Sequence, residues 1–138
     1  GTNARNTHPI YFHHVLKGID NGARSWAIDP RRTATARFTD TWLGLNVGTD
    51  IGLANGVARE IISAGLTDDE FISNATTGYG EFVAFVEPWT LEHTAEVTGV
   101  SAEAIRDLAH GYATAPTAQI CWTLGITEHH TGVDNVLS

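Results

Sequence analysis

Cysteine is scarce in this sequence. Cys121 is the only one among 138 residues, so the chain can form neither an internal disulfide nor a CxxC cluster for a metal. Because Cys121 stands in an apolar run at residues 118–122, we expect a buried thiol that packs as a small hydrophobe. The lack of disulfides fits a reducing compartment, and we expect a cytoplasmic location.

Positive charge and long hydrophobic runs are also lacking. Eight Lys and Arg oppose sixteen Asp and Glu, which gives a net charge of −8 and no basic stripe, so we expect no nucleic-acid partner. No stretch approaches the roughly 20 apolar residues of a membrane span, and the first residues lack the pattern of a signal peptide. The 42% apolar content is enough for the core of one globular unit.

Helical and strand patterns alternate along the chain, and glycines follow several of the helical stretches. We expect a helix over residues 7–21, capped by Thr7, with Pro9 in its first turn and Gly22 after its end. Strands are expected over residues 24–28, 41–45 and 118–124. The remaining expected helices cover residues 50–65 with Asp50 as cap, a short stretch after the capping box at 67–70, 81–86, 91–98, 101–113 and the chain after 133.

This alternation predicts an α/β fold, a Rossmann-like open sheet with flanking helices. Residues 1–3 have the character of a turn that follows a strand, yet no strand precedes Gly1, and the last residues begin a helix without its remainder. We therefore expect an internal fragment, a single partial α/β domain over residues 1–138 that lacks the strand before Gly1.

Four turns fall where strands are expected to end: residues 1–7, 29–33, 48–50 and 125–130. Asn3, Asn6 and Thr7 lie at an expected helix N-terminus, where free backbone N–H groups and the positive end of the helix dipole favour a pyrophosphate. Asp29 follows at the next strand end, from where its carboxylate can accept hydrogen bonds from a ribose or a base. Beside it, Arg31 can meet a phosphate or stack on a base.

Asp50 is a further carboxylate that can accept two N–H bonds from a guanine edge. Each of these residues also has a simpler interpretation: Asn3 and Asn6 as turn formers, Asp29 as turn chemistry before Pro30, and Asp50 as a helix cap. The first turn has no GxGxxG pattern, which argues against an ordinary nicotinamide site.

Two pairs of neighbouring histidines do not match a metal motif. His13 and His14 point about 100° apart on a helix, so they cannot chelate one ion together, and surface or capping roles are favoured. His129 and His130 lie with Glu128 in an expected loop, where lining a pocket or handling protons is favoured over metal binding. Glu128 can also cap the helix that follows.

Taken in order, four motifs resemble the molybdopterin oxidoreductase family: GTNARNTHP at 1–9, DPRRTATA at 29–36, WLGLNVGTD at 42–50 and WTLGITE at 122–128. TGVSAEAIR at 98–106 also resembles this family. The ending GITEHHTGVDNV at 125–136 is most similar to formate dehydrogenase alpha subunits. The resemblance covers nearly the whole chain.

The resemblance implies that one guanine dinucleotide arm of a bis(molybdopterin guanine dinucleotide) cofactor, with molybdenum or tungsten, lies across these strand ends. By position, Asn3, Asn6 and Thr7 would approach its phosphates and ribose. Asp29 and Arg31 would approach the guanosine. The guanine would meet Gly48 and Asp50, and the pterin side would be lined by Leu124, Gly125 and Glu128, where relatives commonly have glutamine in place of Glu128.

The resemblance also implies protein groups that this chain does not carry. In the family a Cys or selenocysteine completes the metal site and a [4Fe–4S] cluster sits on an N-terminal Cys motif, so we expect both before Gly1. The fragment alone would then be inactive, with no catalytic residue and no metal ligand of its own. Its expected partners are the remainder of the same large subunit and an electron-transfer subunit, without a membrane span.

Three functions follow as hypotheses. The first is part of an enzyme that oxidises formate to carbon dioxide with transfer of two electrons. The second is another activity of the same family, similar to nitrate reductase or acetylene hydratase. The third, from a different class, is a non-catalytic nucleotide-binding module.

Overall fold

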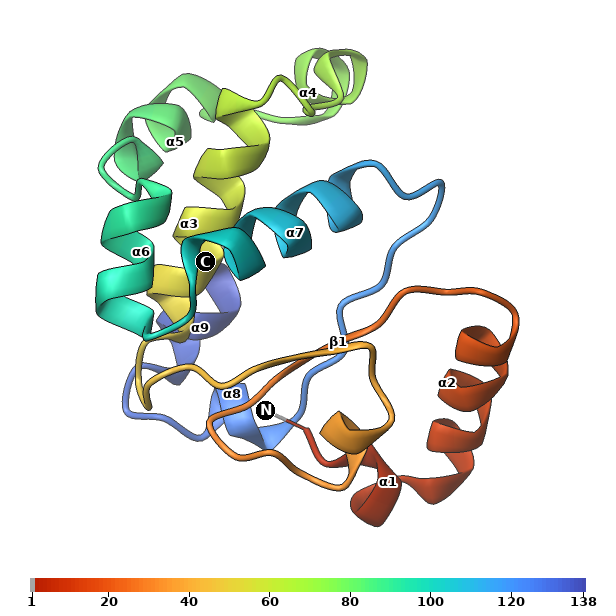
Figure 1. Cartoon of the computed structure of the whole chain (residues 1–138). Coiled ribbons are helices and arrows are strands. Elements are labelled where there is room, and N and C mark those ends of the chain that lie inside the picture. Colours follow the sequence, from red (N-terminus) through yellow and green to blue (C-terminus); the bar gives the residue numbers. More distant parts are fainter. Residues whose placement is uncertain (1) are drawn as a thin grey trace. The chain divides into compact units, whose positions relative to one another are not determined.

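The chain forms two compact units in a computed structural model that describes residues 2–138 (Figure 1). The sheet unit contains the described residues up to Gly48 together with Ile120–Leu137. The helical unit contains Thr49–Gln119 and Ser138.

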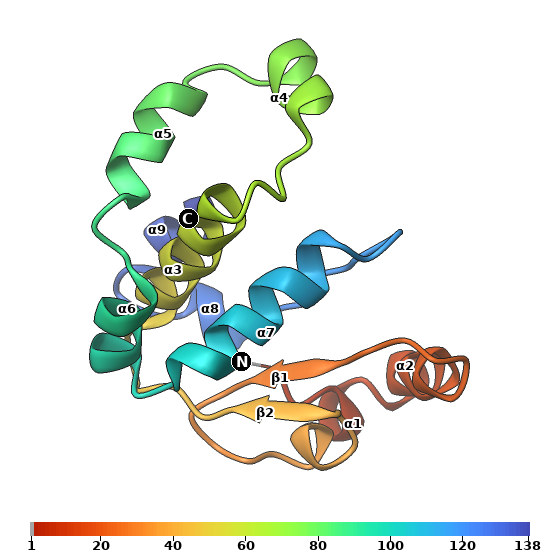
Figure 2. The ribbon, with the colours of Figure 1, turned by 45° about the horizontal axis from the view of Figure 1, so that its top comes forward.

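The sheet unit is built around two short parallel strands, which Figure 2 shows side by side. Trp26 pairs with Thr41, Ala27 with Trp42 and Ile28 with Leu43. Because parallel strands need a crossover, the connection carries a 3-10 turn in place of a hairpin. The elements of this unit are α1 (Ala4–Thr7), α2 (Pro9–Asp20), β1 (Trp26–Ile28), η1 (Thr35–Arg37), β2 (Thr41–Leu43), α8 (Leu124–Thr127) and α9 (Gly132–Leu137).

Two of the three expected strands are confirmed and one is wrong. β1 and β2 lie within the expected ranges 24–28 and 41–45. Residues 118–123 form no strand, and α8 begins at Leu124 where the strand was expected to end. An apolar run becomes a strand only where a neighbour pairs with its backbone, and Ile120 instead lies 63% exposed.

The first long helix begins two residues later than expected. Thr7 ends the short helix α1 and His8 is the N-cap of α2, so Thr7 does not cap the long helix. Pro9 occupies the first turn, and Gly22 follows the helix with a φ of 91°, as expected for a glycine at that place.

The helical unit packs three helices against α3. Its elements are α3 (Asp50–Ser63), α4 (Asp69–Ala75), α5 (Tyr79–Val86), α6 (Leu91–Thr98) and α7 (Ala102–Ala113). α3 contacts α5, α6 and α7, and α6 also contacts α7. Leu53, Val86, Leu91, Ile105 and Ala109 are buried in this core.

Helix starts in this unit follow ordinary capping chemistry. The hydroxyls of Thr90 and Ser101 accept hydrogen bonds from the third backbone N–H after them, which starts α6 and α7 as the sequence indicates. Two expected caps are wrong by one residue: Asp68, and not Thr67, caps α4, and Thr49 occupies the N-cap of α3, so Asp50 is the first helical residue.

The chain is thus mainly helical with a small two-stranded parallel sheet. Among residues 2–138, no helix combines the length and the apolarity needed to cross a bilayer.

Candidate functional site

The turn after β1 contains the nearly buried carboxylate of Asp29, of which one oxygen accepts a hydrogen bond from a described residue and the other does not. The side chain of Asp29 is 9% exposed. Its Oδ1 accepts the backbone N–H of Arg31 at 2.8 Å, and Nε of Arg31 lies 3.9 Å from the same oxygen. Within residues 2–138, Oδ2 takes part in no hydrogen bond. The local fold therefore holds Asp29 in place through Oδ1 and leaves Oδ2 available as an acceptor.

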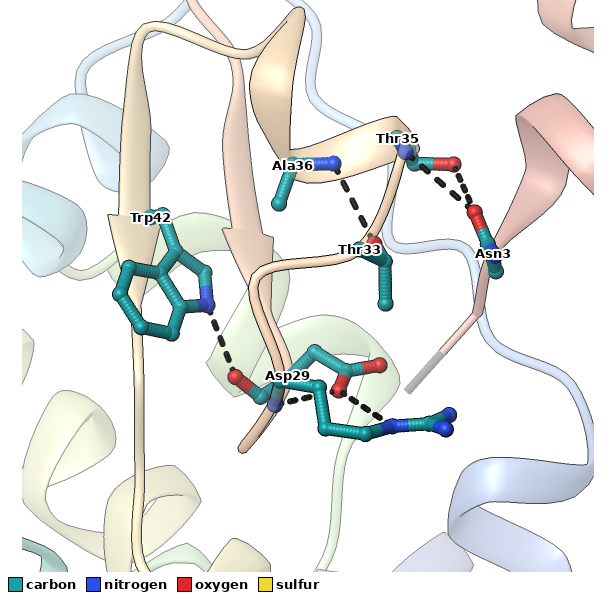
Figure 3. A network of polar contacts seen from close by, with 7 residues as sticks. Asn3, Asp29, Thr33, Thr35, Ala36 and Trp42 are labelled. Carbon is teal, nitrogen blue, oxygen red and sulfur yellow. Dashed lines mark hydrogen bonds and ion pairs between the residues drawn. The ribbon is translucent and has the colours of Figure 1, made fainter.

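Trp42 fixes the main chain of this turn from the neighbouring strand. Its indole Nε1 donates to the carbonyl oxygen of Asp29 at 2.8 Å, as Figure 3 shows. The guanidinium of Arg32 lies 5.9 Å from the centroid of the same ring. Gly44 leaves room for the indole, since a Cβ at that position would lie 2.7 Å from the ring.

Asn3 links the first turn to the loop after β1 (Figure 3). Its Oδ1 accepts from the backbone N–H of Thr35 at 3.3 Å and from the hydroxyl of Thr35 at 3.2 Å. The backbone N–H of Arg5 donates to the same hydroxyl oxygen at 3.0 Å. The amide nitrogen of Asn3 has no partner in the described part of the chain, so its two N–H groups can donate to an anion.

The loop after β1 is closed by threonines that the sequence analysis did not single out. The hydroxyl of Thr33 accepts the backbone N–H of Ala36 at 3.3 Å, and Thr33 itself donates its N–H to the carbonyl of Arg31 at 2.8 Å. Both Thr33 and Thr35 lie in the DPRRTATA motif, and the alternation of threonine with alanine there is the signal that could have revealed them.

Asn6 and Thr7 lie exposed in the short helix α1. The hydroxyl of Thr7 is already used, because it donates to the carbonyl of Asn3 at 3.1 Å and lies 2.8 Å from Nδ1 of His8. The side chain of Asn6 makes no hydrogen bond within residues 2–138. Of the two, Asn6 has the free polar group.

Gly48 and Asp50 stand where the sheet unit ends and the helical unit begins. Gly48 is exposed with a φ of 83°, a conformation that favours glycine. Asp50 opens the first turn of α3, half-buried, and its carboxylate has no partner in the described residues. The interpretation of Asp50 as an N-cap is therefore wrong, which leaves its carboxylate available as an acceptor.

Leu124, Gly125 and Glu128 belong to the helical segment that replaces the expected strand and loop. All three are exposed. Glu128 is the C-cap of α8 and does not cap the next helix. The amide of Asn135 donates to the carbonyl of Ile126 at 2.9 Å and holds α8 beside α9.

The cysteine differs from expectation. Cys121 is exposed and not buried, and its Sγ lies 2.8 Å from the phenol oxygen of Tyr11. This hydrogen bond raises the pKa of Tyr11 to about 12, with burial as a second cause. The neighbours of Cys121 along the chain are apolar, but residues 118–123 do not enter the core.

The neighbouring histidines of α2 lie at the surface. His13 and His14 lie exposed in α2, in agreement with a surface role. Within residues 2–138, no three His, Cys, Asp or Glu side chains gather closely enough to hold a metal ion.

The available groups fit a nucleotide chemically. In the sheet unit, Asp29 supplies an acceptor for N–H groups or ribose hydroxyls, and Asn3 and Asn6 supply donors for phosphate. In the helical unit, Asp50 supplies an acceptor of its own. The structure joins Asn3 to the loop that follows Asp29 through Thr35. Arg31 lies beside Asp29 with its side chain 83% exposed.

Known proteins match this chain along its length. A formate dehydrogenase alpha subunit of Methanococcus maripaludis, the F420-dependent enzyme 2, is 44% identical over 100% of this chain and 20% of its own length. Formate dehydrogenase H of Escherichia coli is 39% identical over 100% of this chain and 19% of its own length. The chain thus spans about a fifth of these curated relatives.

A solved structure has the same fold. Acetylene hydratase from Pelobacter acetylenicus superposes with a TM-score of 0.81 at 35% identity, over 84% of this chain and 16% of that one. The family model described as molybdopterin oxidoreductase matches residues 1–137. With nearly every residue inside that match, the chain belongs to the molybdopterin oxidoreductase family.

Proposed function

We propose that this chain is the part of a formate dehydrogenase large subunit that holds one guanine dinucleotide arm of a bis(molybdopterin guanine dinucleotide) cofactor. Family membership implies a molybdopterin cofactor. The dinucleotide form, the metal and the contacts described below belong to the proposal. In the same proposal, the two-stranded sheet is part of a larger Rossmann-like sheet in a domain that extends beyond this chain.

The observation that carries the proposal is the state of Asp29. A carboxylate that is 9% exposed loses hydration, and a partner is needed to offset that loss. Arg31 offsets it at Oδ1 only. A ribose hydroxyl or a guanine N–H would donate to Oδ2, so that both carboxylate oxygens of Asp29 have a partner. The exposed guanidinium of Arg31 would lie against the base.

The other roles follow from the free groups. The amides of Asn3 and Asn6 would donate to the phosphates. Thr7 would lie beside them in the same turn, with its hydroxyl and its backbone N–H already donated to the carbonyl of Asn3. Asp50 would accept from the guanine edge, next to Gly48, where the absence of a Cβ allows close approach. The exposed residues Leu124, Gly125 and Glu128 would line the pterin side.

When bound, such a cofactor supplies two-electron redox chemistry at its metal. The residues of this chain would bind and orient one arm, and the Cys or selenocysteine ligand and the [4Fe–4S] cluster would come from the rest of the large subunit. An electron-transfer subunit would take up the electrons. The proposed location is the cytoplasm, on the cysteine content alone.

Formate is favoured as substrate over the other activities of the family. Identity is 44% and 39% to the two formate dehydrogenases, against 36% over 82% of the chain for an acetylene hydratase of Syntrophotalea acetylenica. A nitrate reductase of Synechocystis is 31% identical, and an assimilatory nitrate reductase subunit of Bacillus subtilis is 35% identical.

The substrate is tested on the complete protein, purified without oxygen. Formate-dependent reduction of a viologen dye is expected, without nitrate reduction by the reduced dye and without hydration of acetylene to acetaldehyde. Nitrate or acetylene turnover in place of formate oxidation would move the protein to the second hypothesis. A complete protein that contains no pterin dinucleotide would contradict the cofactor role and favour the non-catalytic module.

A further inference from the structure

We propose that Trp42 is a positioning residue for the guanosine contact. Its indole N–H fixes the direction of the Asp29 carboxylate, and the missing side chain of Gly44 keeps the indole in place. The inference rests on the proposed function, in which Asp29 accepts a hydrogen bond from the nucleotide. It extends the set of residues on which that contact depends to the neighbouring strand.

Asp29 is held at both ends of its backbone and at one carboxylate oxygen. Its N–H donates to the carbonyl of Leu43 in β2 at 3.2 Å, and its Oδ1 accepts from the N–H of Arg31 at 2.8 Å. Its carbonyl oxygen accepts from Nε1 of Trp42 at 2.8 Å (Figure 3). Two residues of β2 therefore hold the residue that directly follows β1.

The carbonyl of Asp29 takes this donor from outside its own turn. Pro30 has no N–H group, and the N–H of Arg31 is already donated to Oδ1. The N–H of Thr33 is donated to the carbonyl of Arg31 at 2.8 Å. A carbonyl in a buried residue needs a donor, because burial without one costs free energy. Trp42 thus sets the orientation of the peptide between Asp29 and Pro30.

This orientation decides where Oδ2 of Asp29 points. The peptide plane fixes the backbone torsion ψ of Asp29, and the bond from Arg31 fixes Oδ1. With both fixed, Oδ2 keeps one direction, and a nucleotide meets an acceptor that is already ordered. Without the indole N–H, the peptide can rotate and the cost of ordering the carboxylate falls on the binding step. The nucleotide would then be released faster.

Gly44 controls the position of the indole. Residues two apart in an extended chain lie on the same face, so Gly44 follows Trp42 on the face that the ring covers. A Cβ at Gly44 would lie 2.7 Å from Cζ2 and 2.9 Å from Cη2 of Trp42. Both atoms belong to the rigid six-membered ring, so the whole indole would have to shift, and Nε1 with it. Gly44→Ala is therefore a second way to disturb the same hydrogen bond.

The test measures how fast the complete protein releases its bound guanine nucleotide in urea below the unfolding range. Trp42→Phe keeps an aromatic ring and removes the N–H. Trp42→His keeps a donor, because Nε2 of histidine is as many bonds from Cβ as Nε1 of tryptophan. The expected release is about three- to tenfold faster in Trp42→Phe, the loss of one neutral hydrogen bond, and within about twofold of wild type in Trp42→His.

Gly44→Ala tests the same hydrogen bond independently. It should speed release to a similar extent in the wild-type background and should have no effect in the Trp42→His background, because imidazole lacks Cζ2 and Cη2. Gly80→Ala is the matched control, since nothing lies within 4 Å of a Cβ at that position. An effect of Gly44→Ala that persists in Trp42→His would overturn the pairing of Gly44 with Trp42.

Two further readouts separate a positioning role from support of the sheet. In an Asp29→Asn background, Trp42→Phe should add less than about twofold, because the effects of residues that act through one contact are not additive. Hydrogen exchange of residues 26–28 and 41–43 should stay at the wild-type level in Trp42→Phe. Full additivity, or faster exchange in both strands, would overturn the inference.

The failure of this inference is distinguishable from that of the proposed function. Wild-type release in Trp42→Phe, together with faster release in Asp29→Asn, would overturn the role of Trp42 and leave the proposed function standing. Wild-type release in both variants would contradict the proposed contact of Asp29 as well.

Discussion

A single carboxylate at the end of β1 has two tasks in this account. Oδ1 of Asp29 stabilises the turn by accepting the N–H of Arg31, while Oδ2 is left for a ligand. Order in the turn therefore does not depend on the ligand. A substitution that keeps the acceptor at Oδ1 and changes Oδ2 can therefore remove the ligand contact without disturbing the turn.

Tyr11 gives a prediction on titration at the same scale. Cys121→Ala removes the hydrogen-bond partner that raises the pKa of Tyr11 to about 12, so this pKa should fall towards 10.0. Cys121→Ser keeps a hydroxyl partner and should keep the pKa raised. The pKa is measured by phenolate absorbance during a pH titration of the complete protein, with Tyr11→Phe subtracted. An unchanged pKa in Cys121→Ala would contradict the contact.

The sign of the linked stability follows from this shift. The folded-state pKa lies above the ordinary value of 10.0, so the contact favours the protonated phenol. Its contribution is fully present below pH 10 and is lost as pH rises from there through about 12.

Residue types in the site could be predicted from sequence better than their partners. Asp29 and Arg31 were expected in a turn at a strand end, and they lie in the turn after β1. Asn3 was expected at a helix N-terminus and is the N-cap of α1, whereas the strand expected before it stays a prediction. The bonds from Thr35 to Asn3 could not be predicted, because they join residues 32 apart in the chain. Cys121 was expected to be buried because its neighbours are apolar, and burial depends on contacts that sequence neighbours do not determine.

At the scale of elements, the close approach of α3 and α6 depends on a missing side chain. A Cβ on Gly56 would lie 2.8 Å from Cβ of Thr94, which is fully buried. Gly56→Ala should therefore destabilise this contact by about 1–3 kcal/mol through overpacking. The measurement is hydrogen exchange of α3 and α6 in the complete protein.

Gly80→Ala is the control for that variant. Nothing lies within 4 Å of a Cβ at Gly80 in α5, so alanine there should leave stability unchanged or raise it by less than about 1 kcal/mol. If protection of α3 and α6 stayed at the wild-type level in Gly56→Ala, the tight packing would be refuted.

Elements with local signals were the ones that could be predicted. Helices α6 and α7 follow their apolar period and their caps, α5 follows its apolar period, and β1 ends just before Asp29 and Pro30. The expected strand at 118–124 failed because pairing is a non-local property. The backbone of the apolar run at residues 118–123 pairs with no strand, and α8 starts inside the range expected for the strand.

At the scale of the whole molecule, the chain is a cofactor-binding piece in our proposal and not a catalyst. It spans about a fifth of its formate dehydrogenase relatives. Motif order over the full length revealed the family, although each motif alone has a simpler explanation in turn or cap chemistry. The division into two units was not evident from the sequence, because no linker composition marks residues 48 and 49.

The most direct test of the central claim is the guanine nucleotide content of the complete protein carrying Asp29→Asn. Asparagine keeps an oxygen for the N–H of Arg31 but turns the free acceptor into a donor, so the turn should persist while the nucleotide contact is lost. Hydrogen bonds to charged groups contribute about 1.5–3 kcal/mol each. Asp20→Asn, an exposed carboxylate at the end of α2, is the matched control.

The nucleotide is released by acid hydrolysis and quantified per polypeptide. We predict that Asp29→Asn loses roughly half of its guanine nucleotide or more, that Asp50→Asn loses a similar share, and that Asp20→Asn retains the wild-type content. Wild-type content in both Asp29→Asn and Asp50→Asn would contradict the claim that these carboxylates hold the guanosine.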